Sequence, residues 1–228
     1  MTPPFYVYFT GGAGVGKSHL IHAIVQMVNR ELRQPGDSLD DAIVILTAPT
    51  GTAAYAIRGQ TLHSAFMISA KGITTLSAEK LAMLRNKFPK LILIIIDDVS
   101  MVGANLLKLV YERYVATRKL PLASLFAGIN VLAIGDFQQL SPVGESPVYK
   151  PPRSGYVGLA ELWTSNFKVV KLTDIMRQQG DTAFADLLSR LRVGRQTSDD
   201  LDTLKSRQIT IKASLLEMMM STVTTRAV

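Results

Sequence analysis

Residues 5–18 read FYVYFTGGAGVGKS, a short aromatic and β-branched run that leads directly into a glycine-rich segment. The last eight of these residues satisfy the pattern G-x-x-x-x-G-K-[ST] of a phosphate-binding loop, which needs a strand before it and a helix after it. Residues 5–9 predict the strand, and apolar residues at helical spacing follow within residues 21–28. The context therefore favours a functional phosphate-binding loop over a chance glycine-rich turn.

The glycines of this loop let backbone N–H groups converge on phosphate oxygens beside the positive end of the following helix. We expect Lys17 to reach the β- and γ-phosphates of ATP, as a catalytic residue, and the Ser18 hydroxyl to ligate Mg²⁺. ATP and Mg²⁺ are therefore the predicted cofactors. The residues expected to bind the nucleotide are Gly12, Ala13, Gly14, Val15, Gly16, Lys17 and Ser18.

Outward from the loop, strand-like and helix-like segments alternate along the chain. Apolar or β-branched runs predict further strands at residues 42–47, 91–96, 130–134 and 169–172. Apolar residues at helical spacing predict helices within residues 107–114 and 184–191. This alternation predicts an α/β fold with a mainly parallel sheet flanked by helices. A length of 228 residues fits one large domain or two small ones, and we expect residues 1–228 to form one domain.

The run LILIII at residues 91–96 has no polar alternation and is followed by Asp97 and Asp98. Such a run is typical of a strand that is buried on both faces of a parallel sheet. Ligands gather at the carboxyl ends of strands in open α/β sheets, so both carboxylates should face the phosphate-binding loop. We expect both to be catalytic residues. Asp97 is the predicted metal ligand, and Asp98 is the candidate base that orients or deprotonates the attacking water.

Composition narrows the function classes. The absence of cysteine excludes disulfide frameworks, cysteine zinc sites and thiol nucleophiles, and the three histidines are too scattered to suggest zinc. No apolar run approaches the ~18–20 residues of a membrane helix, and no secretory signal is visible, so we expect a soluble intracellular protein. The 25 basic and 18 acidic residues give a net charge of +7, which fits a nucleic-acid partner without requiring one.

Two stretches interrupt the alternation of strands and helices. Residues 141–158 hold four prolines and three glycines, which predicts a long irregular loop. Residues 67–90 could form a small inserted element, although a solvated charged helix explains the same residues. The basic side chains of this second stretch are Lys71, Lys80, Arg85, Lys87 and Lys90.

Five segments in one order narrow the function beyond nucleotide binding. They are TAPTGTAA (47–54), GQTLHSAF (59–66), IIIDDVSMV (94–102), GDFQQLSPV (135–143) and LTDIMRQ (172–178). This series resembles the petite-integration-frequency (PIF-type) family of DNA helicases, superfamily 1B motors related to RecD-like helicases. FADLLSRLRVG at residues 184–194 is similar to the stretch that follows in that family. The resemblance implies an ATP-dependent 5′-to-3′ DNA helicase, represented by the first of two RecA-like motor domains, with the second domain outside this chain.

The resemblance also implies roles for single residues. Gln139 matches the glutamine that senses the γ-phosphate and couples it to the DNA track, and Arg177 matches an arginine that touches the γ-phosphate. A planar, permanently charged guanidinium suits the charge that spreads over a transferring phosphoryl group. Asp136 resembles the acid that supports the sensor loop. Gln139 and Arg177 are therefore further candidate catalytic residues.

Single-stranded DNA is the partner that the resemblance implies, and it should cross the loops at the carboxyl ends of the strands. The residues that match DNA-binding segments of the family are Pro49, Thr50, Gly51, Thr61 and His63. Phe66 could stack on a base, but core packing is favoured because apolar aromatic side chains are usually buried. Residues 67–90 occupy the place where the family has a small strand-separating element.

Two departures from the family pattern bear on activity: the aspartate at position 98, and the second motor domain that we expect to lie outside this chain. Asp98 stands where the family has a glutamate, so its carboxylate would lie about 1.5 Å further from the expected water. Ser141 replaces the first of two prolines, a change that we expect to be minor. The last residues, TTRAV (224–228), resemble the start of the segment that leads into the second domain. We therefore expect this chain to bind nucleotide and DNA without unwinding DNA by itself.

Two alternative functions stay open on the sequence alone. A nucleotide-gated DNA-binding protein with weak hydrolysis would result if Asp98 does not support the reaction. An RNA-directed or unrelated phosphate-loop ATPase is the second alternative. By resemblance, the helicase hypothesis also implies forked or structured DNA as a partner, and roles in DNA repair, recombination and telomere maintenance. It further implies a nuclear or mitochondrial location, with a monomer as the expected state.

Overall fold

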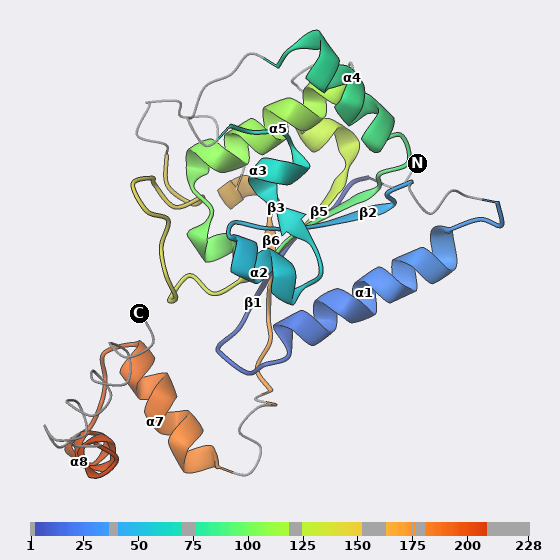
Figure 1. Cartoon of the computed structure of the whole chain (residues 1–228). Helices are drawn as coiled ribbons and strands as arrows, with labels where there is room; N and C mark the ends of the chain where they lie inside the picture. Colours follow the sequence, from blue (N-terminus) through green and yellow to red (C-terminus); the bar gives the residue numbers. More distant parts are fainter. Residues whose placement is uncertain are drawn as a thin grey trace, which may run out of the picture. The chain divides into compact units, whose positions relative to one another are not determined.

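The structure is a computed structural model that describes residues 3–36, 41–69, 76–118, 125–151, 163–174, 176 and 181–208. The chain divides into two compact units, residues 1–180 and residues 181–228. A six-stranded sheet in the order β3-β2-β4-β5-β1-β6 forms the centre of the first unit (Figure 1). All neighbouring strands in it pair in parallel, so the predicted α/β fold with a mainly parallel sheet is confirmed.

All the predicted strands are present, with ends that differ by at most two residues from the prediction. The strand bounds are β1 Tyr6–Thr10, β2 Val44–Ala48, β3 Gln60–Thr61, β4 Leu93–Ile96, β5 Asn130–Gly135 and β6 Lys168–Lys171. The sequence did not predict β3, because a strand of two residues is too short to show an alternating pattern.

The buried strand β4 explains why its sequence lacks polar alternation. Ile94 and Ile96 pack into the core on one face of the sheet, and Leu93 and Ile95 pack into the core on the other. Leu93 is 3% exposed and the three isoleucines are fully buried. Successive side chains of a strand point to opposite faces, so a strand that is covered on both faces is apolar throughout.

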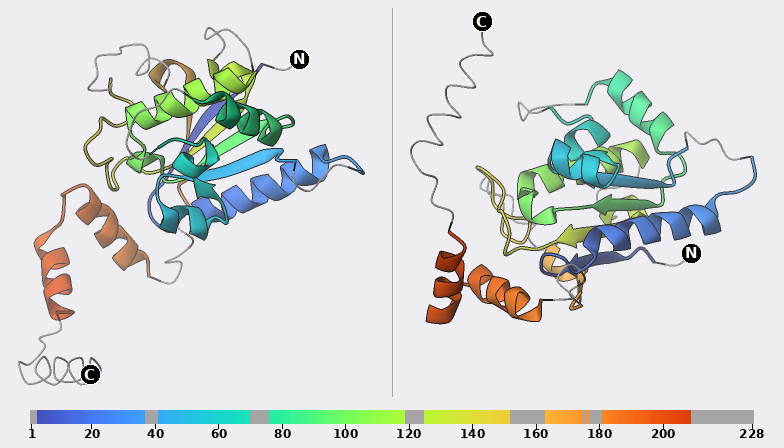
Figure 2. Two further views of the ribbon diagram at one scale, coloured as in Figure 1. Left: turned by 45° about the horizontal axis from the view of Figure 1, so that its top comes forward. Right: turned by 60° about the horizontal axis from the view of Figure 1, so that its bottom comes forward.

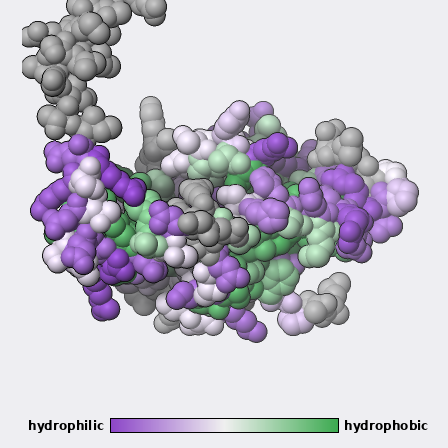
Figure 3. Space-filling view, turned by 90° about the horizontal axis from the view of Figure 1, so that it is seen from below, coloured by the Kyte–Doolittle hydropathy of each residue, from purple (hydrophilic) through white to green (hydrophobic). Residues whose placement is uncertain are grey.

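Helices cover both faces of the sheet. One core includes residues of α3 (Leu62–Ala65), α4 (Ala78–Lys87) and α5 (Ala104–Arg118), and the other includes residues of α1 (Lys17–Leu32) and α2 (Gly51–Ala56). Figures 1 and 2 show α5 and α1 on opposite sides of the sheet. Several apolar residues of the α1 side are only partly buried, and apolar surface is visible in the view from below in Figure 3.

The structure bears on two predictions for the segment after β3. Phe66 is fully buried and packs against Phe88, with ring centroids 5.6 Å apart, which confirms that Phe66 belongs to the core. Residues 67–90 contain α4, which begins after its N-cap Ser77. Lys71 lies outside the described residues.

The predicted long loop is irregular in its described part, residues 141–151, which contains no helix and no strand of a sheet. The described part of the first unit also contains two short 3₁₀ helices, Val99–Met101 directly after β4 and Leu125–Gly128 before β5. Residues 152–158 of the predicted loop lie outside the described part of the chain.

The described part of the second unit, residues 181–208, contains two helices, α7 (Thr182–Arg192) and α8 (Ser198–Ser206). The sequence predicted α7 but not α8. The Asp200 carboxylate accepts two hydrogen bonds from the Arg190 guanidinium, at 2.6 and 2.7 Å, and a third from the Thr197 backbone N–H at 2.9 Å. Asp200 therefore joins the two helices and closes the capping box at the start of α8.

Replacing Asp200 by Asn is expected to loosen the second unit. The Arg190 hydrogen bonds, followed by that of Thr197, hold the pKa of the Asp200 carboxyl well below its ordinary value. A lowered pKa in the folded state gives stability that is present above about pH 4 and is lost at lower pH. The protection factors of the α7 and α8 amides should therefore fall in the variant at pH 6, and in the wild type as the pH drops below 4, each relative to the intrinsic exchange rate at that pH.

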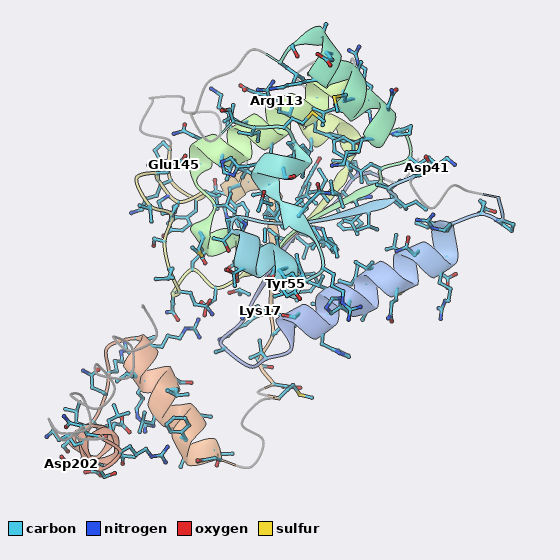
Figure 4. The ribbon with its side chains drawn as sticks, in the orientation of Figure 1. Lys17, Asp41, Tyr55, Arg113, Glu145 and Asp202 are labelled. Carbon is cyan, nitrogen blue, oxygen red and sulfur yellow. The ribbon has the colours of Figure 1, made fainter. Side chains whose placement is uncertain are left out.

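The matched control is Asp202→Asn, because Asp202 lies on the same helix with 74% of its side chain exposed. Figure 4 labels Asp202. Unchanged exchange in Asp200→Asn would show that the Arg190 contact does not hold the two helices together.

Candidate active site

The phosphate-binding loop connects β1 to α1 at the carboxyl edge of the sheet. Gly14 and Gly16 have φ angles of 80° and 81°, a left-handed conformation that residues with a Cβ rarely adopt. Gly16 is the N-cap of α1 and, having no side chain, caps none of the N–H groups of the first turn. The positive end of α1 therefore lies at the loop without a side-chain cap, which favours the binding of an anion.

Lys17 lies at the start of α1 and turns back across the loop (Figure 4). Its Nζ donates to the carbonyl oxygens of Gly11 at 2.9 Å and Gly12 at 2.8 Å. The ammonium group is therefore positioned at the bend of the loop, where a phosphate chain would bind.

A pocket of about 520 Å³ lies beside the loop and brings together residues that are distant in sequence. Its described lining consists of Ala13, Gly14, Gly16, Lys17, Ser18, His19, Gln139 and Met176. The predicted nucleotide-binding residues Gly12 and Val15 belong to the loop but not to this described lining. Gln139 and the loop share the pocket, as the motif series predicts for a γ-phosphate sensor.

His19 and Met176 also line the pocket, and neither was predicted as a site residue. The Met176 backbone N–H donates to the Gly14 carbonyl at 2.8 Å, which attaches the segment after β6 to the phosphate-binding loop. The available signal for Met176 was its place in the motif LTDIMRQ, directly before Arg177. Arg177 itself lies outside the described residues.

The loop after β5, which carries Gln139, is held by Asp136, which is 2% exposed. The Asp136 carboxylate accepts from the Gln138 backbone N–H at 3.1 Å and from the Gln139 side-chain amide at 3.3 Å. The Gln139 backbone N–H donates to the Asp136 carbonyl at 2.8 Å. These contacts confirm that Asp136 supports the loop that carries Gln139.

Asp97 lies directly after β4 and is 7% exposed. Its backbone N–H donates to the Thr47 carbonyl on β2 at 2.8 Å. Burial raises the pKa of the Asp97 carboxyl to about 6; the Asp98 backbone N–H and the Lys17 charge oppose this shift, whereas the Asp98 charge adds to it. The effect of Lys17 places its ammonium group within electrostatic reach of Asp97. A buried carboxylate of this kind is a favourable ligand for a cation.

Asp98 adopts a left-handed backbone conformation, with φ 47° and ψ 44°. For a residue with a Cβ, this conformation costs about 1–2 kcal/mol and turns the chain sharply into the following 3₁₀ helix. Gly135, at the end of β5, permits this turn to approach closely, because a Cβ at Gly135 would lie only 3.0 Å from the Val99 backbone nitrogen. The turn that begins at Asp98 and the end of strand β5 are therefore packed directly against each other. Among the described residues that line the pocket, neither Asp97 nor Asp98 appears.

The residues matched to DNA-binding segments lie at the carboxyl ends of two neighbouring strands. Thr50 is the N-cap of α2 and accepts from the Ala53 N–H at 3.2 Å, and Thr61 is the N-cap of α3 and accepts from the Ser64 N–H at 3.1 Å. In the parallel pair of β2 and β3, Ala48 lies opposite Thr61. The structure thus brings Pro49, Thr50 and Gly51 to the same edge of the sheet as Thr61 and His63.

Gly59 makes this arrangement possible. A Cβ at Gly59 would lie 2.6 Å from the Leu46 carbonyl oxygen, which belongs to the backbone of β2 and cannot move aside easily. We expect Gly59→Ala to destabilise the fold by about 1–3 kcal/mol, as measured by urea unfolding. Gly51→Ala is the control, since a Cβ there has no neighbour within 4 Å, and its effect should stay within about 0.5 kcal/mol. Equal effects of the two changes would contradict the proposed close contact.

Lys87, at the end of α4, connects this helix to the second DNA-matched segment. Its Nζ donates to the Gln60 side-chain oxygen at 3.0 Å and to the Ala65 carbonyl at 3.4 Å. Burial lowers the pKa of Lys87. The basic stretch is therefore not only a solvated charged face, because one of its lysines is a packed structural contact.

Within the described part of the chain, no three His, Cys, Asp or Glu side chains gather into a cluster that could hold a metal ion. A divalent cation would instead share one or two protein oxygens with the phosphates of a bound nucleotide, as Mg²⁺ commonly does. None of the helices described is both long and apolar enough to cross a membrane.

Comparison with known proteins agrees with this geometry. The family model described as PIF1-like helicase matches residues 3–202. The ATP-dependent DNA helicase PIF1 of Emericella nidulans is 31% identical over 206 residues, which cover 87% of this chain and 26% of that protein.

Two solved structures show the same fold. The crystal structure of the Pif1 helicase from Candida albicans is 29% identical, with a TM-score of 0.72, over 91% of this chain and 45% of that one. The Bacteroides Pif1 helicase in complex with ADP-AlF3 and single-stranded DNA is 28% identical, with a TM-score of 0.65, over 91% of this chain and 48% of that one. This chain therefore spans about a quarter of the Emericella protein and less than half of each of these two solved chains. Because the family model covers most of its length, the chain belongs to the PIF1-like helicase family.

Proposed function

We propose that this chain is the first motor domain of an ATP-dependent DNA helicase that moves 5′ to 3′ along single-stranded DNA. The observation that carries the proposal is the pocket in which Gln139 shares a wall with Lys17 and Ser18. Gln139 is bonded to Asp136 at the end of β5, so a change in its contact with a phosphate would be transmitted to the sheet edge. A motor needs such a connection between the nucleotide and the elements that hold its track.

The chemistry assigned to the pocket is attack of water on the γ-phosphate of ATP. Lys17 and the N–H groups of the loop bind the phosphates, while the Ser18 hydroxyl and the Asp97 carboxylate would hold Mg²⁺. When bound, this ion offsets the negative charge of the transferring phosphoryl group. Asp98 orients or deprotonates the attacking water, and Arg177 contributes positive charge at the γ-phosphate.

The DNA-binding role of this sheet edge is supported by its threonine hydroxyl groups, which can donate hydrogen bonds to a ligand. Thr50 and Thr61 each use an oxygen lone pair to cap a helix, so each O–H hydrogen can still be donated to a DNA phosphate. His63 lies in the first turn after Thr61 and adds a second type of donor. The two caps lie on neighbouring strands, which suits contacts with successive phosphates of a single strand.

Finer points of the proposal follow from the family rather than from single contacts. Forked or structured DNA is the proposed substrate, residues 67–90 are the proposed strand-separating element, and a monomer is the proposed state. DNA repair, recombination and telomere maintenance, in the nucleus or mitochondrion, are the proposed settings. The Bacteroides relative was solved with single-stranded DNA, which supports the choice of DNA as the track.

The test is ATP hydrolysis by the natural full-length protein, with and without single-stranded DNA. Strong stimulation by DNA, and weaker stimulation by an RNA of the same sequence, is the expected result. Binding of nucleotide and DNA without stimulated hydrolysis would instead support a nucleotide-gated DNA-binding protein. Asp98, an aspartate where the family has a glutamate, is the feature that favours this second candidate.

A further inference from the structure

Glu145 lies in the loop after the sensor glutamine and rests on the first turn of α5 (Figure 4). Its Oε2 accepts from the Leu106 backbone N–H at 3.4 Å. The first N–H groups of a helix have no partner within the helix, so a carboxylate at this place is favoured by hydrogen bonding and by the helix dipole. Glu145 thus acts as an N-terminal cap that comes from a distant part of the sequence.

Gly103 provides the space that this cap occupies. A Cβ at Gly103 would overlap the Glu145 carboxylate and would lie 2.7 Å from the Glu145 Cβ. Gly103 has no left-handed backbone angle, so the requirement for glycine at this position is one of space alone. The two residues therefore form a matched pair.

The next two residues of the loop are also attached to the start of α5, through backbone contacts. The Ala104 N–H donates to the Ser146 carbonyl at 2.8 Å, and Gly103 forms an antiparallel bridge with Pro147. Val148, which follows, is 1% exposed and belongs to the core. The loop is thus fixed along residues 145–148, and Glu145 is the part of this contact made by a side chain.

The attachment joins the two segments that carry the candidate water-activating and sensing groups. On one side, a tight 3₁₀ turn separates Asp98 from Gly103, with the Met101 N–H bonded to the Asp98 carbonyl at 3.0 Å. On the other side, the loop runs from Gln139 to Glu145. The two segments also meet at Gly135, against which the Val99 nitrogen packs. The segment that carries Asp98 and the segment that carries Gln139 therefore contact each other at two places, one at Glu145 and one at Gly135.

We infer that Glu145 is a positioning residue, which holds Asp98 and Gln139 at a fixed separation across the γ-phosphate. The inference rests on the proposed hydrolysis of ATP at this site. Glu145 is not among the described residues that line the pocket, and it acts through the first turn of α5 and the 3₁₀ turn before it. Loss of the contact leaves the phosphate-binding loop intact, so catalysis should suffer more than nucleotide binding.

The test is a double-mutant cycle in the natural full-length protein, with kcat and KM for ATP measured at saturating single-stranded DNA. Glu145→Ala and Gly103→Ala should each lower kcat by about 10- to 100-fold, with KM for ATP changed less than about threefold. The double variant should lose less than the product of the two single losses, because removal of the carboxylate relieves the closest overlap with the new methyl group and leaves only the Cβ of residue 145, at 2.7 Å. Glu145→Gln keeps an acceptor oxygen and should retain most of the activity.

Glu112→Ala is the control, because Glu112 lies on α5 with 44% of its side chain exposed and forms an ion pair with Lys108, at 3.7 Å. Multiplicative losses in the double variant, or equal changes in kcat and KM, would overturn the inference. A second measurement keeps the test independent of turnover: hydrogen exchange of residues 98–106 and 136–146 should rise in Glu145→Ala. Unchanged exchange overturns the positioning role even in a protein that hydrolyses ATP. Raised exchange in a protein without hydrolysis rejects the proposed function and retains the contact.

Discussion

Asp97→Asn is expected to abolish ATP hydrolysis and, at the same time, to stabilise the nucleotide-free protein. The carboxylate is nearly buried, and burial raises its pKa from 3.8 to about 6. A shift of about two pKa units means that the ionised form costs the folded state about 3 kcal/mol. Asn removes this charge, but its amide must also be satisfied, so we expect a net gain of about 1–2 kcal/mol at pH 7.

The pH dependence of unfolding distinguishes this effect from a general change in packing. The folded protein holds a proton on Asp97 up to about pH 6, whereas the unfolded chain releases it near pH 4. The contribution of Asp97 to stability therefore falls as the pH rises through this window. Thermal unfolding without nucleotide should show the variant more stable than the wild type at pH 7, with the difference nearly gone at pH 4.

The second part of the experiment measures ATP hydrolysis by the full-length protein. The rate of hydrolysis by Asp97→Asn should be at least 10³-fold lower, roughly the effect of removing a metal ligand from a phosphoryl-transfer site. Asp202→Asn, with its exposed carboxylate in the second unit, should change neither property. A variant that is less stable at pH 7 would show that Asp97 is well solvated or already paired in the folded protein.

The sequence predicted the strongly patterned elements and missed the short ones. The uninterrupted apolar run of β4 and the helical spacing of apolar residues in α1 and α5 each follow from burial in the core. Burial of this kind produces a pattern within a short stretch of sequence, so it can be predicted from that stretch alone. By contrast, α2 and α3 have six and four residues and depend on the Thr50 and Thr61 caps. A usable signal for α8 was present, because Thr197 and Asp200 have the spacing of a capping box.

The candidate site was predictable where one contiguous motif supplies the residues. The phosphate-binding loop needs only its own glycines and the adjacent strand and helix, so eight residues of sequence specify it. The contribution of Met176 to the pocket, and that of Glu145 to α5, depend on contacts between segments that are far apart in sequence. Neither residue type nor spacing identifies such contacts, because they arise when parallel strands bring their carboxyl ends to one edge of the sheet.

Asp98 is the residue whose replacement should most sharply separate the two candidate functions. If it is the base, Asp98→Asn lowers kcat by about 10²–10⁴-fold and leaves the affinity for ATP nearly unchanged. Asn suits the test because it, like Asp, tolerates the left-handed backbone at this position, φ 47° and ψ 44°, better than most residues.

The opposite substitution tests the reach of the carboxylate. Asp98→Glu extends the side chain by one methylene, about 1.5 Å, toward the expected position of the water. We expect kcat to rise if the shorter aspartate limits hydrolysis, and single-turnover measurements with DNA present should reveal it. Glutamate in a left-handed backbone adds strain, so a rise in kcat would occur together with a lower unfolding temperature. Full activity in Asp98→Asn would instead assign the water to another group and reject Asp98 as the base.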